Sequence, residues 1–123
     1  MQLTKAEEQV MQYLWKIEEG VVQHVRDCFK DPKPSRTTVS TILRILEAKG
    51  FVGHKTHGRR THTYYPLIRK EDYSKHQLFG IMKKYFNNSF AAMASFFAKE
   101  SDMSLQEMEA LLEETKNELK LVK

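Results

Sequence analysis

The sequence has one cysteine and no long apolar run. That cysteine, Cys28, excludes a disulfide framework and any zinc or iron–sulfur site built from several cysteines. No stretch approaches the roughly 18 consecutive apolar residues of a membrane-spanning helix. No apolar signal-peptide core occurs in the first ten residues, MQLTKAEEQV, so we expect a cytoplasmic protein that does not insert into a membrane. Nucleophile-elbow, phosphate-loop and metal-hydrolase motifs are also lacking, so we expect no enzymatic activity.

Positive charge is concentrated in the first part of the chain. The 123 residues carry a net charge of +4, but residues 1–70 hold 13 Lys and Arg against 7 Asp and Glu, whereas residues 71–123 hold 7 against 9. Over residues 33–70 nine basic residues accompany one acid, Glu47. Such a basic block on a folded domain indicates a polyanionic partner, most often nucleic acid; the alternative is a basic face that only contacts solvent.

Hydrophobic periodicity predicts three helices in the first fifty residues. The first opens with a capping box at Thr4 and is closed by Gly20. A short second helix covers about residues 22–30, because the prolines that follow it cannot continue a helix. The third begins after Ser35 as N-cap and runs to about Lys49. Its core-facing stripe consists of Val39, Ile42, Leu43 and Leu46.

After the third helix the pattern changes to that of strands. Residues 51–56 and 61–67 are rich in β-branched and aromatic side chains, and the glycine-containing stretch between them has the length of a hairpin loop. Three helices followed by a hairpin with a basic tip is the order of a winged helix-turn-helix. We therefore expect a mainly α fold with a small β-hairpin, in which residues 1–70 form a winged-helix DNA-binding domain.

Residues 71–123 are helical in pattern and predict a three-helix dimerisation arm. Fourteen of the twenty-one residues 78–98 are apolar or tyrosine, and Ser104 opens the last helix. About 50 residues rarely bury enough area to be stable alone, so we expect a second copy of the arm, in a homodimer, to cover these side chains. The predicted interface residues are Leu78, Ile81, Met82, Phe86, Phe90, Met93, Phe96, Phe97, Met108, Leu111 and Leu112.

The third helix carries the clearest functional signal. Opposite its core stripe lie small hydroxyl side chains and arginine, the chemistry that reads base edges in the major groove of DNA. Threonine and serine are indifferent helix formers, so a surface without a ligand would favour other residues. We predict base contacts by Thr37, Thr38, Ser40, Thr41 and Arg44. We predict backbone contacts by Ser35, Arg36, Lys55, His57, Arg59 and Arg60.

Histidines in the hairpin raise the question of a metal. His54, His57 and His62 cluster there, but no carboxylate or cysteine lies beside them at a ligand spacing. We expect solvated or phosphate-contacting imidazoles, and we expect no metal and no cofactor.

Two other functions remain open at this point. Winged helices also serve as protein-interaction modules, a use that needs neither a Ser/Thr/Arg helix face nor a basic wing. A small-molecule-responsive winged-helix regulator is the second alternative, in which aromatic residues between Phe79 and Phe97 would line a ligand pocket.

The chain resembles the BlaI/MecI family of bacterial repressors over nearly its whole length. The similarity rests on the order and spacing of TKAEEQVMQYLW, SRTTVSTILRILEAKGFVGHK, TYYPLI and MSLQEMEALL. It implies an N-terminal winged-helix domain, a helical dimerisation arm and repression by occupation of a palindromic operator of β-lactam-resistance genes. It also implies relief of repression when a membrane sensor of β-lactam triggers proteolysis in the arm.

Two departures from the family pattern affect this comparison. The best-known members are cut at an Asn–Phe bond in the arm, and the corresponding place here reads Ser95-Phe96, so Ser95 and Phe96 mark the possible cleavage bond. Related copper-responsive repressors carry several C-terminal cysteines, and none occurs in this arm, which disfavours a copper sensor.

Overall fold

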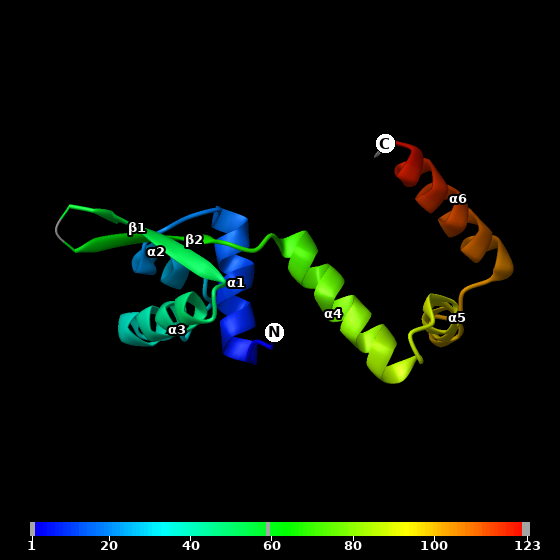
Figure 1. Cartoon of the computed structure of the whole chain (residues 1–123), viewed down its shortest axis with the longest axis horizontal. Helices are drawn as coiled ribbons and strands as arrows, with labels where there is room; N and C mark the ends of the chain where they lie inside the picture. Colours follow the sequence, from blue (N-terminus) through cyan, green and yellow to red (C-terminus); the bar gives the residue numbers. More distant parts are fainter. Residues whose placement is uncertain (1, 59, 122–123) are drawn as a thin grey trace. The chain divides into compact units, whose positions relative to one another are not determined.

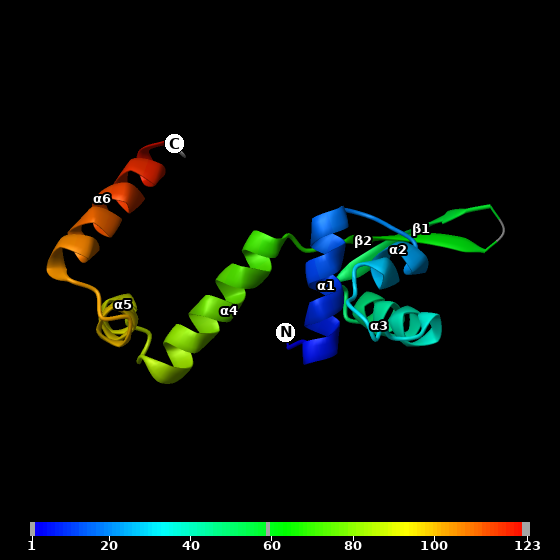
Figure 2. The ribbon, with the colours of Figure 1, turned by 180° about the vertical axis from the view of Figure 1, so that it is seen from behind.

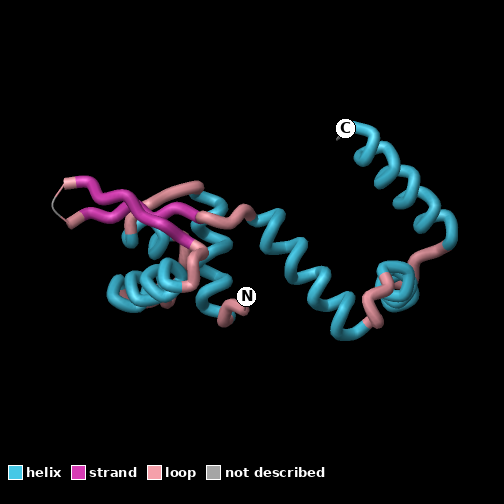
Figure 3. Tube along the Cα trace, viewed as in Figure 1, coloured by secondary structure: helices cyan, strands magenta, loops and turns pink. Residues whose placement is uncertain are grey.

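The computed structural model describes residues 2–58 and 60–121 and divides the chain into two compact units, residues 1–75 and 76–123. Figures 1 and 2 show the elements from opposite sides, and Figure 3 shows the two strands after the first three helices. The described elements are α1 (Lys5–Ile17), α2 (Val22–Asp27), α3 (Arg36–Ala48), β1 (Val52–His57), β2 (Thr61–Pro66), α4 (Lys70–Tyr85), α5 (Phe90–Glu100) and α6 (Leu105–Leu121). This order confirms the predicted mainly α fold with a winged helix-turn-helix followed by three helices.

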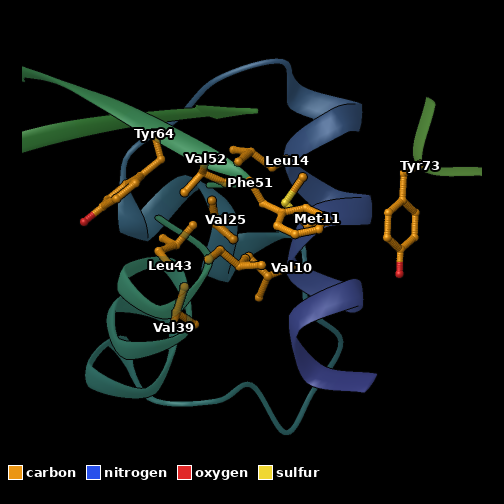
Figure 4. Close-up of a cluster of buried hydrophobic side chains, with 11 residues drawn as sticks. Val10, Met11, Leu14, Val25, Val39, Leu43, Phe51, Val52, Tyr64 and Tyr73 are labelled. Carbon is orange, nitrogen blue, oxygen red and sulfur yellow. The ribbon is translucent and has the colours of Figure 1, made fainter. Parts of the chain in front are cut away.

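The core of the first unit lies between the first three helices and the hairpin (Figure 4). Its fully buried side chains are Val10, Met11 and Leu14 of α1, Val25 of α2, and Val39, Leu43 and Leu46 of α3. β1 and β2 add Val52 and Tyr64. Full burial of one aliphatic side chain contributes about 1.5–3 kcal/mol, so each of these elements is held in place by its share of the core. The predicted stripe of α3 is thereby confirmed, with Ile42 packed at its edge.

The capping box at the start of α1 is present as predicted. The Thr4 amide donates to Glu7 Oε1 at 2.8 Å, and the Glu7 amide donates to Thr4 Oγ1 at 3.2 Å. The buried Glu7 carboxylate also accepts from Lys49 Nζ at 2.7 Å. Because α1 begins beside the end of α3, this ion pair joins the two helices.

The ion pair predicts a pH dependence of stability. Lys49 holds the pKa of Glu7 below its ordinary value of 4.5, so the pair stabilises the fold above pH 4.5 and this contribution is lost as the pH falls through the lowered pKa. Lys49 is partly exposed, so we expect Lys49→Met to cost roughly 1 kcal/mol at pH 7. Urea unfolding at a series of pH values measures the difference. A cost that stays the same down to pH 3 would contradict the assignment.

α1 ends earlier than the sequence predicts. Gly20 was expected to close it, but the helix ends at Ile17, and Glu18 adopts a φ of 72° with its N–H donating to the Leu14 carbonyl at 2.8 Å. Gly20 instead pairs with Tyr64 of β2 through bonds of 3.0 and 2.8 Å. A Cβ on Gly20 would lie 2.9 Å from Ile17 Cδ1 and 3.0 Å from His24 Cβ, so the close approach of these side chains of α1 and α2 accounts for the glycine.

β1 and β2 form an antiparallel hairpin that is the wing. Their register runs from Val52 opposite Pro66 to His57 opposite Thr61. Side chains alternate between the two faces of a strand pair, so His54, Thr56, His62 and Tyr64 share one face, while Lys55 and His57 belong to the other.

The first turn of α4 belongs to the first unit. Tyr73 is buried there, its hydroxyl donates to Glu8 Oε2 at 3.0 Å, and its ring lies 5.7 Å from that of Trp15 and 6.0 Å from that of Phe51. Figure 4 shows Tyr73 on the side of α1 away from Leu43. Burial, and then the bond to Glu8, raises the pKa of Tyr73 to about 12, so the phenol stays protonated at neutral pH.

The second unit has well-defined helix starts but little core. Ser89 caps α5 by accepting the Ala92 amide at 3.1 Å, and Ser104 caps α6 by accepting the Glu107 amide at 3.1 Å. Phe86 and Phe96 have ring centroids 5.5 Å apart. Of the side chains described in residues 76–120, none is buried in the single chain.

Within the described residues, no helix is both long enough and apolar enough to cross a membrane.

Candidate nucleic-acid interface

The N-terminus of α3 is held by the side chain that the sequence predicts. Ser35 Oγ accepts the Thr38 amide at 3.1 Å and lies 2.9 Å from Thr38 Oγ1. Arg26 of α2 fixes the preceding residue by donating from Nε to the Pro34 carbonyl at 2.7 Å. The hydroxyls of Ser35 and Thr38 therefore already have protein partners, although both residues are exposed.

The side of α3 opposite its core stripe presents polar and cationic groups to solvent. Thr37, Thr41 and Arg44 are exposed and Ser40 is half-buried, because the helical period places them away from Leu43 and its buried neighbours. Of the five predicted base-contacting side chains, Thr37, Ser40, Thr41 and Arg44 share one surface, whereas Thr38 lies apart from it and contacts Ser35. None of them is packed inside the molecule.

Two adjoining hollows cover this surface. The first, about 320 Å³, is lined by Val22, Arg36, Thr37, Ser40, Thr41 and Arg44. The second, about 290 Å³, is lined by Val21, Val22, Gln23, Arg36, Ser40, Arg44, Arg60, Thr61, His62 and Tyr64. They share four residues on α2 and α3, so they form one continuous depression. We call the second hollow, which β2 also lines, the α3–β2 hollow. Its described lining holds three arginines and one histidine but no carboxylate.

Of the wing residues predicted to contact phosphates, some line this depression and others do not. Arg60 lines the α3–β2 hollow. Lys55 does not; its Nζ lies 3.6 Å from Glu19 Oε1 and 5.5 Å from the centre of the Tyr65 ring. His57 is exposed on the same hairpin face as Lys55. Arg59 lies outside the residues that the structure describes.

Two residues of the hollow were missed in the sequence. Gln23 near the start of α2 and Thr61 of β2 line it beside Arg44. The Gln23 amide nitrogen donates to Asp27 Oδ1 at 2.7 Å, which orients its side chain along the helix. The neighbouring sequence does not mark either residue as part of a binding surface, because each joins this surface only through the packing of α2 and β2 against α3.

Three rings, those of His54, His62 and Tyr64, cluster at one side of the hollow, and His62 and Tyr64 line it. His54 contacts Glu47 through Nδ1 and Oε2, and its ring centroid is 4.4 Å from that of His62 and 5.8 Å from that of Tyr64. Burial, reinforced by the charge of Glu47 and opposed by that of Arg44, raises the pKa of Tyr64. Among the described residues, no group of three or more histidine, cysteine or acidic side chains is arranged to hold a metal ion.

The predicted dimerisation side chains are accessible in the single chain. Those that are exposed are Leu78, Ile81, Phe90, Phe96, Phe97, Leu111 and Leu112, and those that are half-buried are Met82, Phe86, Met93 and Met108. Ser95 and Phe96, at the possible cleavage bond, lie in the middle of α5 and are both exposed.

Comparison with known proteins agrees with this architecture. The family model of the penicillinase repressor matches residues 3–117, nearly the whole chain. The chain belongs to the penicillinase repressor family. This membership confirms the resemblance to BlaI/MecI repressors and supports a DNA-binding transcriptional repressor. No curated protein matches the sequence with statistical significance.

A solved structure gives independent support for the fold of this family member. The complex structure of hsRosR-S1 is similar with a TM-score of 0.53 at 16% sequence identity, over 81% of this chain and 90% of that chain. At that identity the likeness shows the fold alone, a winged helix-turn-helix. The family is one of transcriptional repressors.

Proposed function

We propose that the protein is a homodimeric, sequence-specific repressor that occupies a palindromic operator. One observation carries the proposal: the exposed Ser/Thr/Arg face of α3 continues without a carboxylate, among the described lining residues, into a hollow that adds Arg60 of the wing. A helix with such a face fits the major groove, and a flanking arginine suits the adjacent phosphates.

Each residue has a role in this proposal. Thr37, Thr41 and Arg44 contact base edges, with Ser40 and Thr38 beside them. Phosphates are contacted by Ser35, Arg36, Lys55, His57, Arg59 and Arg60. Two copies of α3 related by two-fold symmetry would read half-sites about 34 Å, or a multiple of that distance, apart.

The second unit supplies the dimer contact. Phe90 and Leu112 are 69% and 63% exposed in the single chain, and exposed apolar groups on this scale mark an interaction surface. A second copy of the same three helices offers the matching apolar surface, and symmetric dimers are the commonest assembly.

The family resemblance extends the proposal to induction. Repression of β-lactam-resistance genes would end when a sensor pathway cleaves the Ser95–Phe96 bond. That bond lies inside α5, whose hydrogen bonds must open before the chain can enter a protease in extended form. We therefore propose that local unfolding of α5 precedes any cut there.

The decisive experiment is selection of bound sites from random duplex DNA. It returns the half-site sequence, the spacing and the symmetry together. We expect two inverted half-sites at a spacing that matches whole turns of the double helix. Enrichment of no sequence, or of a single asymmetric site, would refute the proposed dimeric operator.

Arg44→Ala tests the reading of bases. Arginine in a bidentate contact with guanine contributes about 1–3 kcal/mol of discrimination, so the variant should bind the selected operator about 10- to 100-fold more weakly and lose preference at one base pair. Fluorescence anisotropy with a set of operator variants measures both effects.

Arg60→Ala is the matched control on the wing. A phosphate contact carries no sequence information, so this variant should weaken operator and random DNA alike and reduce the salt slope of log K by about 1. If both variants lose affinity equally on operator and random DNA, the two roles are wrongly assigned.

A further inference from the structure

The histidine of the α3–β2 hollow is His62 of β2. His62 lines that hollow together with Arg36, Arg44 and Arg60. Its Nδ1 lies 3.3 Å from Thr56 Oγ1, which fixes the ring against the opposite strand. The side chain itself is exposed, so an anion that enters the hollow can contact it without any rearrangement of the core.

The groups that face His62 come from several elements. β1 contributes His54, with ring centroids 4.4 Å apart, β2 contributes Tyr64 at 6.3 Å, and the turn before β2 contributes Arg60. α3 contributes Arg36 and Arg44 through the hollow and Glu47 through its contact with His54, and α2 contributes the neutral Gln23. The one carboxylate of this group, Glu47, is therefore already engaged by the other histidine.

This arrangement distinguishes the two histidines. His54 contacts the carboxylate of Glu47 in the unbound protein. His62 shares a hollow with three guanidinium groups and, of the described lining residues, none is an acid. An imidazole changes charge between pH 5 and 8, and an opposite charge at hydrogen-bond distance favours its protonated form.

We propose that the α3–β2 hollow seats one backbone phosphate of bound DNA, that the imidazolium of His62 is a ligand of this phosphate, and that binding takes up a proton at His62. The proton comes from hydronium or the buffer acid: the donor's bond to hydrogen breaks as an N–H bond forms on the ring of His62. The inference rests on the proposed function as a DNA-binding repressor and adds a dependence of affinity on pH. Since a phosphate contact is independent of sequence, the pH effect is the same on operator and random DNA.

The test compares full-length wild type, His62→Gln and His76→Gln on operator and random duplex at constant salt between pH 8 and pH 6. His76 is an exposed histidine of α4 outside the hollow, and glutamine keeps a hydrogen-bonding group in both variants. We expect the affinity of wild type and His76→Gln to rise about 10-fold at the lower pH, because a bound phosphate favours the protonated imidazole. The affinity of His62→Gln should rise less than threefold on both DNAs, a rise that the proposed phosphate contact of His57 can supply.

Calorimetry of wild type in two buffers of different ionisation enthalpy counts the protons taken up, and it serves even if His62→Gln does not fold. About half a proton per chain near pH 7 supports the inference, because a tenfold rise in affinity over two pH units corresponds to that average uptake. Binding without proton uptake, or an undiminished pH effect in His62→Gln, would overturn the inference and leave the proposed function intact. Failure of wild type to bind any duplex at either pH would overturn both.

Discussion

A chain truncated after Lys75 should sediment as a monomer and bind the full operator about 10²- to 10⁴-fold more weakly than the whole protein. Two linked binding modules gain affinity of this size because the second contact becomes intramolecular. The truncation removes the second unit, residues 76–123, and keeps the first unit whole. Sedimentation velocity and fluorescence anisotropy measure the two effects.

A single half-site provides the control for this truncation. The shortened chain should bind an isolated half-site about as well as the full chain does, since α3 and the wing are unchanged. Cooperative unfolding of the shortened chain would show that the first unit folds without the arm. A truncated protein that still sediments as a dimer would refute the role of the arm.

Tyr73→Ala should lower the free energy of unfolding by about 3–5 kcal/mol, as large aromatic truncations in cores do. Tyr73 is 4% exposed and packs its ring against Trp15 and Phe51. Removing it leaves a cavity between α1 and the start of α4. Chemical denaturation followed by tryptophan fluorescence is a suitable measurement, because Trp15 is the single tryptophan and lies beside the cavity.

Tyr73→Phe separates packing from hydrogen bonding at this position. It keeps the ring and removes only the bond to Glu8, so we expect a cost of about 1 kcal/mol. Equal losses in the two variants would mean that the hydroxyl, rather than the ring, holds α4 to the first unit. A cost below 1 kcal/mol for Tyr73→Ala would contradict the burial itself.

Features with a local cause were predicted well from the sequence. Thr4 and Ser35 cap their helices because a hydroxyl before a helical run satisfies free amides within three residues, and both caps are present. The stripe of α3 around Leu43 is buried because the helical period alone decides which side faces the core. The exposed recognition face follows from the same period.

Features that depend on distant packing could not be predicted in this way. Gly20 pairs with Tyr64 only because β2 lies beside it, and Tyr73 is buried only because the first turn of α4 packs against α1. The same holds for the α3–β2 hollow, since Gln23 and Thr61 come from segments almost forty residues apart. Sequence periodicity carries no information on such neighbours.

The contact between Lys55 and Glu19 affects how many counterions the wing releases when it binds DNA. Mobile cations released from DNA make its binding sensitive to salt, and each lysine that reaches a phosphate is normally credited with one such release. In the unbound protein, however, Glu19 already acts as a tethered counterion of Lys55. When Lys55 leaves Glu19 to contact a phosphate, the unpaired carboxylate of Glu19 remains near the duplex and is repelled by it. The number of basic residues in the wing therefore overstates the attraction of the wing for DNA.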